Sequence, residues 1–148
     1  MRKSILIAIA IVYVASIVVV SVFGLKATMY QSNIQVTGIE CVNQDKGEIF
    51  IGETNGIKTI TMNFTEPGDL ESLTGTILQL EIRVLPDDAT NKEIGFRYAR
   101  ENYPQVHFHQ IEGRETGAIA FTGIATFTLT IYSLDVPSIY TQVLIDVV

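Results

Sequence analysis

The residues best suited to chemistry are two histidines, His107 and His109, which are separated by Phe108. On a β-strand, residues two apart lie on one face, so both imidazoles can reach a single metal ion, with Glu112 as a third ligand. The alternative is that Val106 and Phe108 form the apolar face and both histidines are solvated. With no further histidine and one cysteine in the chain, the ligand set is poor for zinc, and we favour solvated histidines.

Acidic side chains gather at two points, Asp87 with Asp88 and Asp69 with Glu71. Aspartate is favoured in turns because its carboxylate accepts hydrogen bonds from nearby backbone amides. Calcium takes about six to eight oxygen ligands, often from an Asp-x-Asp-x-Asp-Gly loop, and the chain has no such loop. These carboxylates are interpreted as turn residues, and no cofactor or metal is expected.

The motifs of common catalytic sites are missing. The sequence has no Gly-x-Ser-x-Gly elbow, no glycine-rich phosphate loop and no His-Glu-x-x-His. A nucleophile and a base that only folding brings together stay an open alternative. The motifs therefore favour a protein that is not an enzyme.

Cys41 is the only cysteine, so the chain cannot form an internal disulfide. We interpret it as a small buried apolar residue, with an intermolecular disulfide as the alternative. The domain must then be held together by its core alone, which a domain of roughly 120 residues can achieve.

The start of the chain predicts a membrane anchor. Residues 4–25 carry no charge and are dominated by Ile, Val, Leu and Ala, and an apolar run of about 18 or more residues can span a bilayer. A cleaved signal peptide has a shorter apolar region and small residues at its cleavage site, where this chain has Leu25. Arg2 and Lys3 favour a cytoplasmic N-terminus. We expect a cytoplasmic tip and transmembrane helix over residues 1–25, and a short stalk over residues 26–33.

The remainder, residues 34–148, is predicted to be an extracytoplasmic all-β domain of a single-pass cell-membrane protein. Its clearest strand covers residues 78–84, where apolar and polar side chains alternate. Some seven or eight strands with no further helix are typical of an antiparallel β-sandwich. The net charge of −6 argues against a nucleic-acid partner. The other predicted strands are residues 34–42, 48–51, 59–64, 94–98, 106–108, 125–131 and 143–147.

Several short motifs recur in one known family. The strand that ends at Pro86 is followed by Ala89-Thr90-Asn91-Lys92 and by a strand with an aromatic residue, Phe96. Within residues 122–130, Gly123 is followed by a stretch in which Thr and apolar residues alternate. Val36-Thr37-Gly38-Ile39 is similar to the opening strand of the family. In these features the chain resembles the bacterial Ig-like domain family, group 2, which is known from adhesins and other surface proteins.

The resemblance implies an immunoglobulin-like sandwich of about seven to eight strands, and it has two departures. The family commonly has Trp where this chain has Phe96, and residues 43–75 are longer than the equivalent stretch. An extra hairpin is therefore expected there. Since a fold does not determine a function, the resemblance carries over no functional residue.

We expect a non-catalytic module that acts as a structural or interaction subunit of a cell-envelope or surface assembly, with protein partners or self-assembly. One alternative is a module that binds a cell-wall polymer or glycan. That function would require exposed aromatic residues gathered on one surface. A second alternative, by analogy of layout, is a stator-like accessory protein of an archaeal surface filament. For the glycan-binding alternative, the aromatic residues whose positions matter are Tyr98, Tyr103, Tyr132 and Tyr140.

Overall fold

The computed structural model describes residues 3, 7, 9, 11–18 and 32–148, in two compact units, Met1–Asn33 and Ile34–Val148. Residues 11–18 are helical. Among the described residues, no helix has the length and apolar character that crossing a membrane requires. Residues 19–25 of the predicted span and several before residue 11 lie outside the described residues, as do stalk residues 26–31. The anchor therefore stays a prediction.

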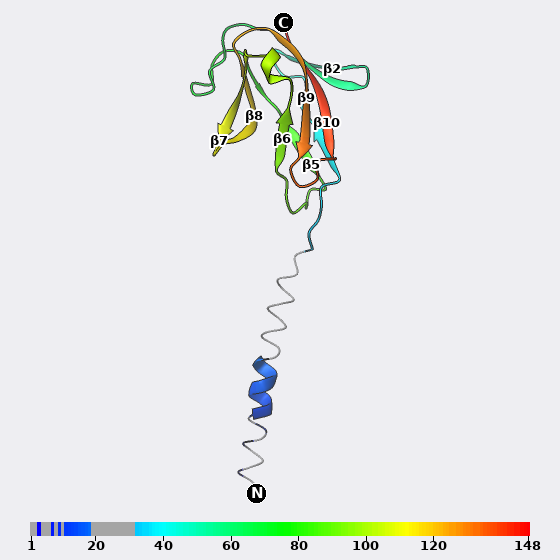
Figure 1. The fold of residues 1–148 in the computed structure, drawn as a ribbon, viewed down its shortest axis with the longest axis vertical. Helices are drawn as coiled ribbons and strands as arrows, with labels where there is room; N and C mark the ends of the chain where they lie inside the picture. Colours follow the sequence, from blue (N-terminus) through cyan, green and yellow to red (C-terminus); the bar gives the residue numbers. More distant parts are fainter. Residues whose placement is uncertain (1–2, 4–6, 8, 10, 19–31) are drawn as a thin grey trace. The chain divides into compact units, whose positions relative to one another are not determined.

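The second unit is all-β, and its strands form a sandwich-like arrangement (Figure 1). A 3-10 turn, η1 (Arg100–Asn102), precedes β7. The strands of the described chain are β1 (Gly38–Cys41), β2 (Ile49–Thr54), β3 (Ile57–Met62), β4 (Ile77–Gln79), β5 (Ile82–Leu85), β6 (Ile94–Arg97), β7 (Val106–Ile111), β8 (Arg114–Phe121), β9 (Ala125–Ser133) and β10 (Tyr140–Val147).

The larger sheet has the order β2-β3-β10-β9-β6, and the smaller ones are β4-β8-β7 and β1-β5. Only Leu80 and Glu81 separate β4 from β5, so one stretch of chain pairs first with β8 and then with β1. The Leu80 amide still donates to the Gly117 carbonyl of β8, whereas the Glu81 carbonyl accepts from Val42, just after β1. The chain thus changes pairing partner at this point.

One apolar core joins the sheets. Along β9, side chains alternate between the core and the outer face, as a half-buried strand requires. The rings of Tyr98 and Tyr103 both lie 5.2 Å from the ring of Phe127, centroid to centroid. The fully buried apolar side chains at the centre of the core are Ile60, Leu78, Ile119, Phe121, Leu129, Ile131, Val143, Ile145 and Val147.

The predicted count of seven or eight strands is wrong, because the described chain has ten. Residues 78–84 form two strands rather than one, and β8 was not predicted at all. In β8 the alternation is broken by a bulge: between the pairs Phe108↔Ile119 and Gln110↔Glu115, one residue of β7 faces three of β8. The sandwich is also not wholly antiparallel, since β3 and β10 run parallel.

Two tight hairpins have turns of the same kind. Asn55 and Gly56 join β2 to β3 with φ values of 53° and 78°, and Glu112 and Gly113 join β7 to β8 with 52° and 78°. Positive φ at both central residues is the mark of the type I′ turn, whose twist suits a two-residue hairpin. The β2–β3 hairpin lies within residues 43–75, where an extra hairpin is expected.

Candidate functional site: a groove beside strand β1

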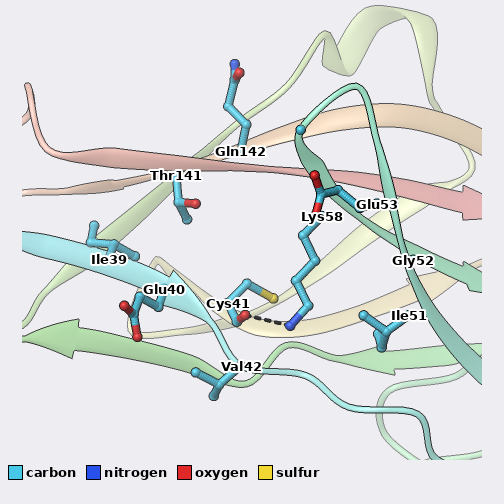
Figure 2. A pocket seen from close by; sticks show the side chains of 11 residues that line it. Ile39, Glu40, Cys41, Val42, Ile51, Gly52, Glu53, Lys58, Thr141 and Gln142 are labelled. Carbon is cyan, nitrogen blue, oxygen red and sulfur yellow. Dashed lines mark hydrogen bonds between the residues drawn. The ribbon is translucent and has the colours of Figure 1, made fainter.

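A groove of about 540 Å³ opens between β1 and the β2–β3 hairpin. Figure 2 shows its side chains: Cys41 and Glu40 come from β1, Glu53 from β2 and Lys58 from β3. The first residues of β10 complete the lining. The groove therefore lies where an edge of the small sheet meets the large one.

Lys58 closes one end of the groove. Its ammonium donates hydrogen bonds to the carbonyl oxygens of Cys41 and Asn43, both at 2.7 Å, and Figure 2 shows the side chain reaching from β3 to the end of β1. A lysine beside a strand edge occupies acceptors that another strand would otherwise use. Lys58 thus ties β3 to β1 and sets the limit of the open edge.

The outer edge of β1 is unpaired over Ile39 and Cys41. Val42 donates its amide to Glu81 beside β5, and residues of an antiparallel strand alternate in the direction of their backbone groups. Ile39 and Cys41 therefore direct theirs away from β5, as the bond from Lys58 to the Cys41 carbonyl confirms. No described backbone group pairs with the Ile39 amide and carbonyl or the Cys41 amide.

Two carboxylates stand at the rim of the groove. Glu40 and Glu53 are exposed, and neither takes part in an ion pair of the described residues. The Lys58 ammonium is engaged by two carbonyls. The groove lining thus has two carboxylates without an ion pair among the described residues, and Arg83 lies opposite Glu40 across β1 and β5.

Asn43 is buried, and its side-chain amide bonds to the backbone on both sides of Leu80, between β4 and β5. Its Nδ2 donates to the Gln79 carbonyl and its Oδ1 accepts from the Glu81 amide, each at 2.8 Å. Oδ1 also accepts from the Cys41 thiol at 3.1 Å. Sequence reasoning missed this residue, because its partners lie 36 and 38 positions away along the chain.

Cys41 is half-buried in the groove wall and forms no disulfide. Burial raises the pKa of its thiol, while the contact with Asn43 and the nearby Lys58 charge act in the opposite direction. The neutral thiol is thus the form that the fold favours. Its contribution to stability is fully present below the pKa of the unfolded thiol and is lost as the pH rises through the folded pKa.

We expect Cys41 of the folded protein to react more slowly with iodoacetamide at pH 8 than the same cysteine in urea-unfolded protein, because the thiolate is the nucleophile. The rate should rise only at a pH above that at which the unfolded thiol ionises. Alkylation followed by mass spectrometry across pH 7–10 measures this. Equal rates in the folded and unfolded chains would contradict a pKa raised by burial.

His107 and His109 are both on β7, and each lies near a threonine. Thr122 Oγ1 is 3.5 Å from Nε2 of His107, and Thr116 Oγ1 is 3.4 Å from Nδ1 of His109. Glu112 is in the hairpin turn beyond them. Within residues 32–148 and the described helix, no three His, Cys, Asp or Glu side chains come together as a metal site.

The predicted turn carboxylates lie in turns with local partners. Asp69 accepts from the Glu71 amide and the Ser72 hydroxyl, and the bond from Ser72 is the main cause that lowers the pKa of Asp69. Asp87 pairs with Arg83 at 2.8 Å, which lowers the pKa of Asp87. These contacts stabilise the two turns.

The four tyrosines divide between two environments. Tyr98 and Tyr103 pack into the core against Phe127. Tyr132 and Tyr140 face one another across β9 and β10 and line a second pocket on the outer face of the large sheet. Two of the four therefore gather on one surface.

No protein-family model matches this chain, and no curated protein matches it in sequence. The resemblance to the bacterial Ig-like domains therefore rests on the short motifs quoted above.

Proposed function

We propose that this chain is a non-catalytic interaction module, a subunit of a cell-envelope or surface assembly that is held at the cell membrane by its N-terminal segment and faces outward. The observation that carries the proposal is the unpaired edge of β1, which opens into the groove. An open strand edge is a template for pairing with another chain.

The domain is proposed to be an immunoglobulin-like sandwich. Such domains place strands A, B, E and D in one sheet and C, F and G in the other. Here β1, the β4–β5 pair, β8 and β7 follow the first order, and β6, β9 and β10 follow the second. This correspondence supports an immunoglobulin-like sandwich.

The partner that fits the groove is an extended polypeptide segment. The Ile39 amide and carbonyl and the Cys41 amide offer the alternating donor and acceptor that an added strand uses. Interaction beyond Cys41 is blocked, because Lys58 occupies the carbonyl there. Strand addition is thus confined to a short stretch beside β1.

The carboxylates at the groove rim determine which side chains on that segment would be complementary. Glu40 and Glu53 line the groove without an ion-pair partner among the described residues, so Lys or Arg side chains on the segment complement them. Charge complementarity of this kind contributes mainly to specificity and association rate. The proposed partner is therefore an extended segment with basic residues.

The test is the native mass of the tagged full-length protein, extracted in mild detergent, together with the proteins that co-purify. We expect a defined complex that the double variant Glu40→Lys/Glu53→Lys loses. A matched control, Glu101→Lys/Glu112→Lys, makes the same charge change at exposed positions outside the groove lining and should retain the complex. A monodisperse wild-type monomer, or a complex that the groove variant retains, would contradict the proposal.

A further inference from the structure

A second pocket, of about 330 Å³, lies on the outer face of the large sheet. There β9 is hydrogen-bonded to β6 on one side and β10 on the other, while residues 140–142 of β10 pair with β9 alone. A ligand on this outer face would be contacted by the side chains that line the pocket. Its lining consists of Arg97, Thr130, Tyr132, Pro137, Tyr140 and Gln142.

The lining residues stand in two cross-strand rows. In the first row, Gly95 of β6 is opposite Tyr132, which is opposite Tyr140. Gly95 leaves room for the Tyr132 ring: a Cβ at position 95 would lie 2.6 Å from Cζ of that ring. The ring is thus laid across β6, and the side chain of Tyr140 beside it is 59% exposed.

The second row places a guanidinium beside these rings. Arg97 is opposite Thr130, which is opposite Gln142, and Cζ of Arg97 lies 4.9 Å from the centroid of the Tyr132 ring. A cation over a tyrosine face is held there by the ring's quadrupole. Contact with the ring therefore positions the guanidinium at the edge of the pocket.

Arg97 differs from the other described arginines in having no carboxylate. Arg83 pairs with Asp87, Arg100 with Glu115 and Arg114 with Glu93. No carboxylate lines the pocket. The planar fork of Arg97 is therefore available for an anion, and carboxylates are bound by such forks with two parallel hydrogen bonds.

The rest of the lining favours a hydroxyl-rich ring over an apolar side chain. Thr130, Tyr132 and Tyr140 supply hydroxyls, and Gln142 supplies an amide, while Pro137 is the one aliphatic side chain in the lining. Tyrosine offers an apolar face together with a polar tip. We propose that the pocket binds an acidic saccharide of the uronic-acid class, with its carboxylate on Arg97 and a sugar ring against Tyr140.

This site shares Gln142 with the groove beside β1 but lies on the outer face of the large sheet, and it gives the glycan-binding alternative a location. The probe is a galacturonate tetrasaccharide, and its methyl ester serves as the matched ligand without charge. Binding to the full-length chain is measured by calorimetry in a detergent that has no sugar headgroup. We expect the acid to bind more tightly than the ester.

Three variants test the residue roles. Arg97→Gln should weaken acid binding by about tenfold or more and remove the preference over the ester, because a hydrogen bond to a charged group is lost. Tyr140→Ala should weaken both ligands. Gly95→Ala should also weaken both, since the new Cβ displaces the Tyr132 ring. The control Arg114→Gln removes an exposed guanidinium outside the pocket and should change neither.

Several outcomes would overturn the proposal. Equal affinity for the acid and the ester would remove the role of Arg97, as would an Arg97→Gln variant that binds like the wild type. A tetraglutamate peptide that binds as tightly as the tetrasaccharide would replace the saccharide by an acidic protein segment. No uronate binding at millimolar concentration would leave the pocket without the proposed ligand.

Discussion

Replacing Asn43 by leucine should lower the free energy of unfolding by about 3 kcal/mol, since each buried hydrogen-bonding group left unpaired costs about 1–3 kcal/mol. The variant removes the partners of the Gln79 carbonyl and the Glu81 amide. Both groups lie at the change from β4 to β5, where neither β8 nor β1 supplies a replacement. Leucine is similar in size, so the loss reports hydrogen bonding more than volume.

Urea denaturation of the full-length protein, followed by far-ultraviolet circular dichroism, measures this loss. Asn91→Leu is the matched control, because the Asn91 side chain accepts one exposed hydrogen bond, from the Glu93 amide. That control should cost less than about 1 kcal/mol, because it removes a single exposed hydrogen bond. Equal losses in the two variants would show that the buried amide does not hold the junction.

The second large effect is expected at Gly75. Its φ is +75°, and a Cβ at this position would lie 2.2 Å from the carbonyl oxygen of Pro67. Alanine at this position would therefore adopt an unfavourable backbone conformation. Its Cβ would also overlap the Pro67 carbonyl oxygen, which cannot rotate away as a flexible side chain could. Gly75→Ala should destabilise the domain by about 3 kcal/mol, the sum of left-handed strain and steric overlap.

Gly113 separates these two causes. Its φ is +78°, nearly that of Gly75, but nothing lies within 4 Å of a Cβ placed there. Gly113→Ala should therefore show the backbone term alone, about 1–2 kcal/mol. The difference between the midpoints of urea denaturation of the two variants measures the overlap with Pro67. Similar midpoints would mean that the segment around Gly75 relaxes freely.

Strands that alternate cleanly between core and solvent were predictable from the sequence. Residues 125–131 lie within β9 because its pattern reports a sheet that is buried on one face. The same alternation concealed the division of residues 78–84. Leu80 is buried, so its hydrophobicity fits an uninterrupted strand, and a period of two carries no information about which neighbour a strand pairs with. A bulge hid β8.

The candidate sites were predictable only in part. Cys41, Tyr132 and Tyr140 attract notice by residue type, but their surroundings decide what they can do. Lys58 and Arg97 are single charged residues in strands, which the sequence gives no reason to separate from solvated surface. Their roles depend on Cys41 and Tyr132, 17 and 35 positions away, and pairing across sheets brings them together.

The parallel pair of β3 and β10 bears on the order in which the fold can be completed. β10 lies between β3 and β9 in the middle of the large sheet and contributes Val143, Ile145 and Val147 to the core. Chains are synthesised from the N-terminus, so β3 and β9 exist before the strand that joins them. Until β10 is available, β3 and β9 each lack the neighbour that β10 supplies in the large sheet. Such distant pairing predicts slow folding.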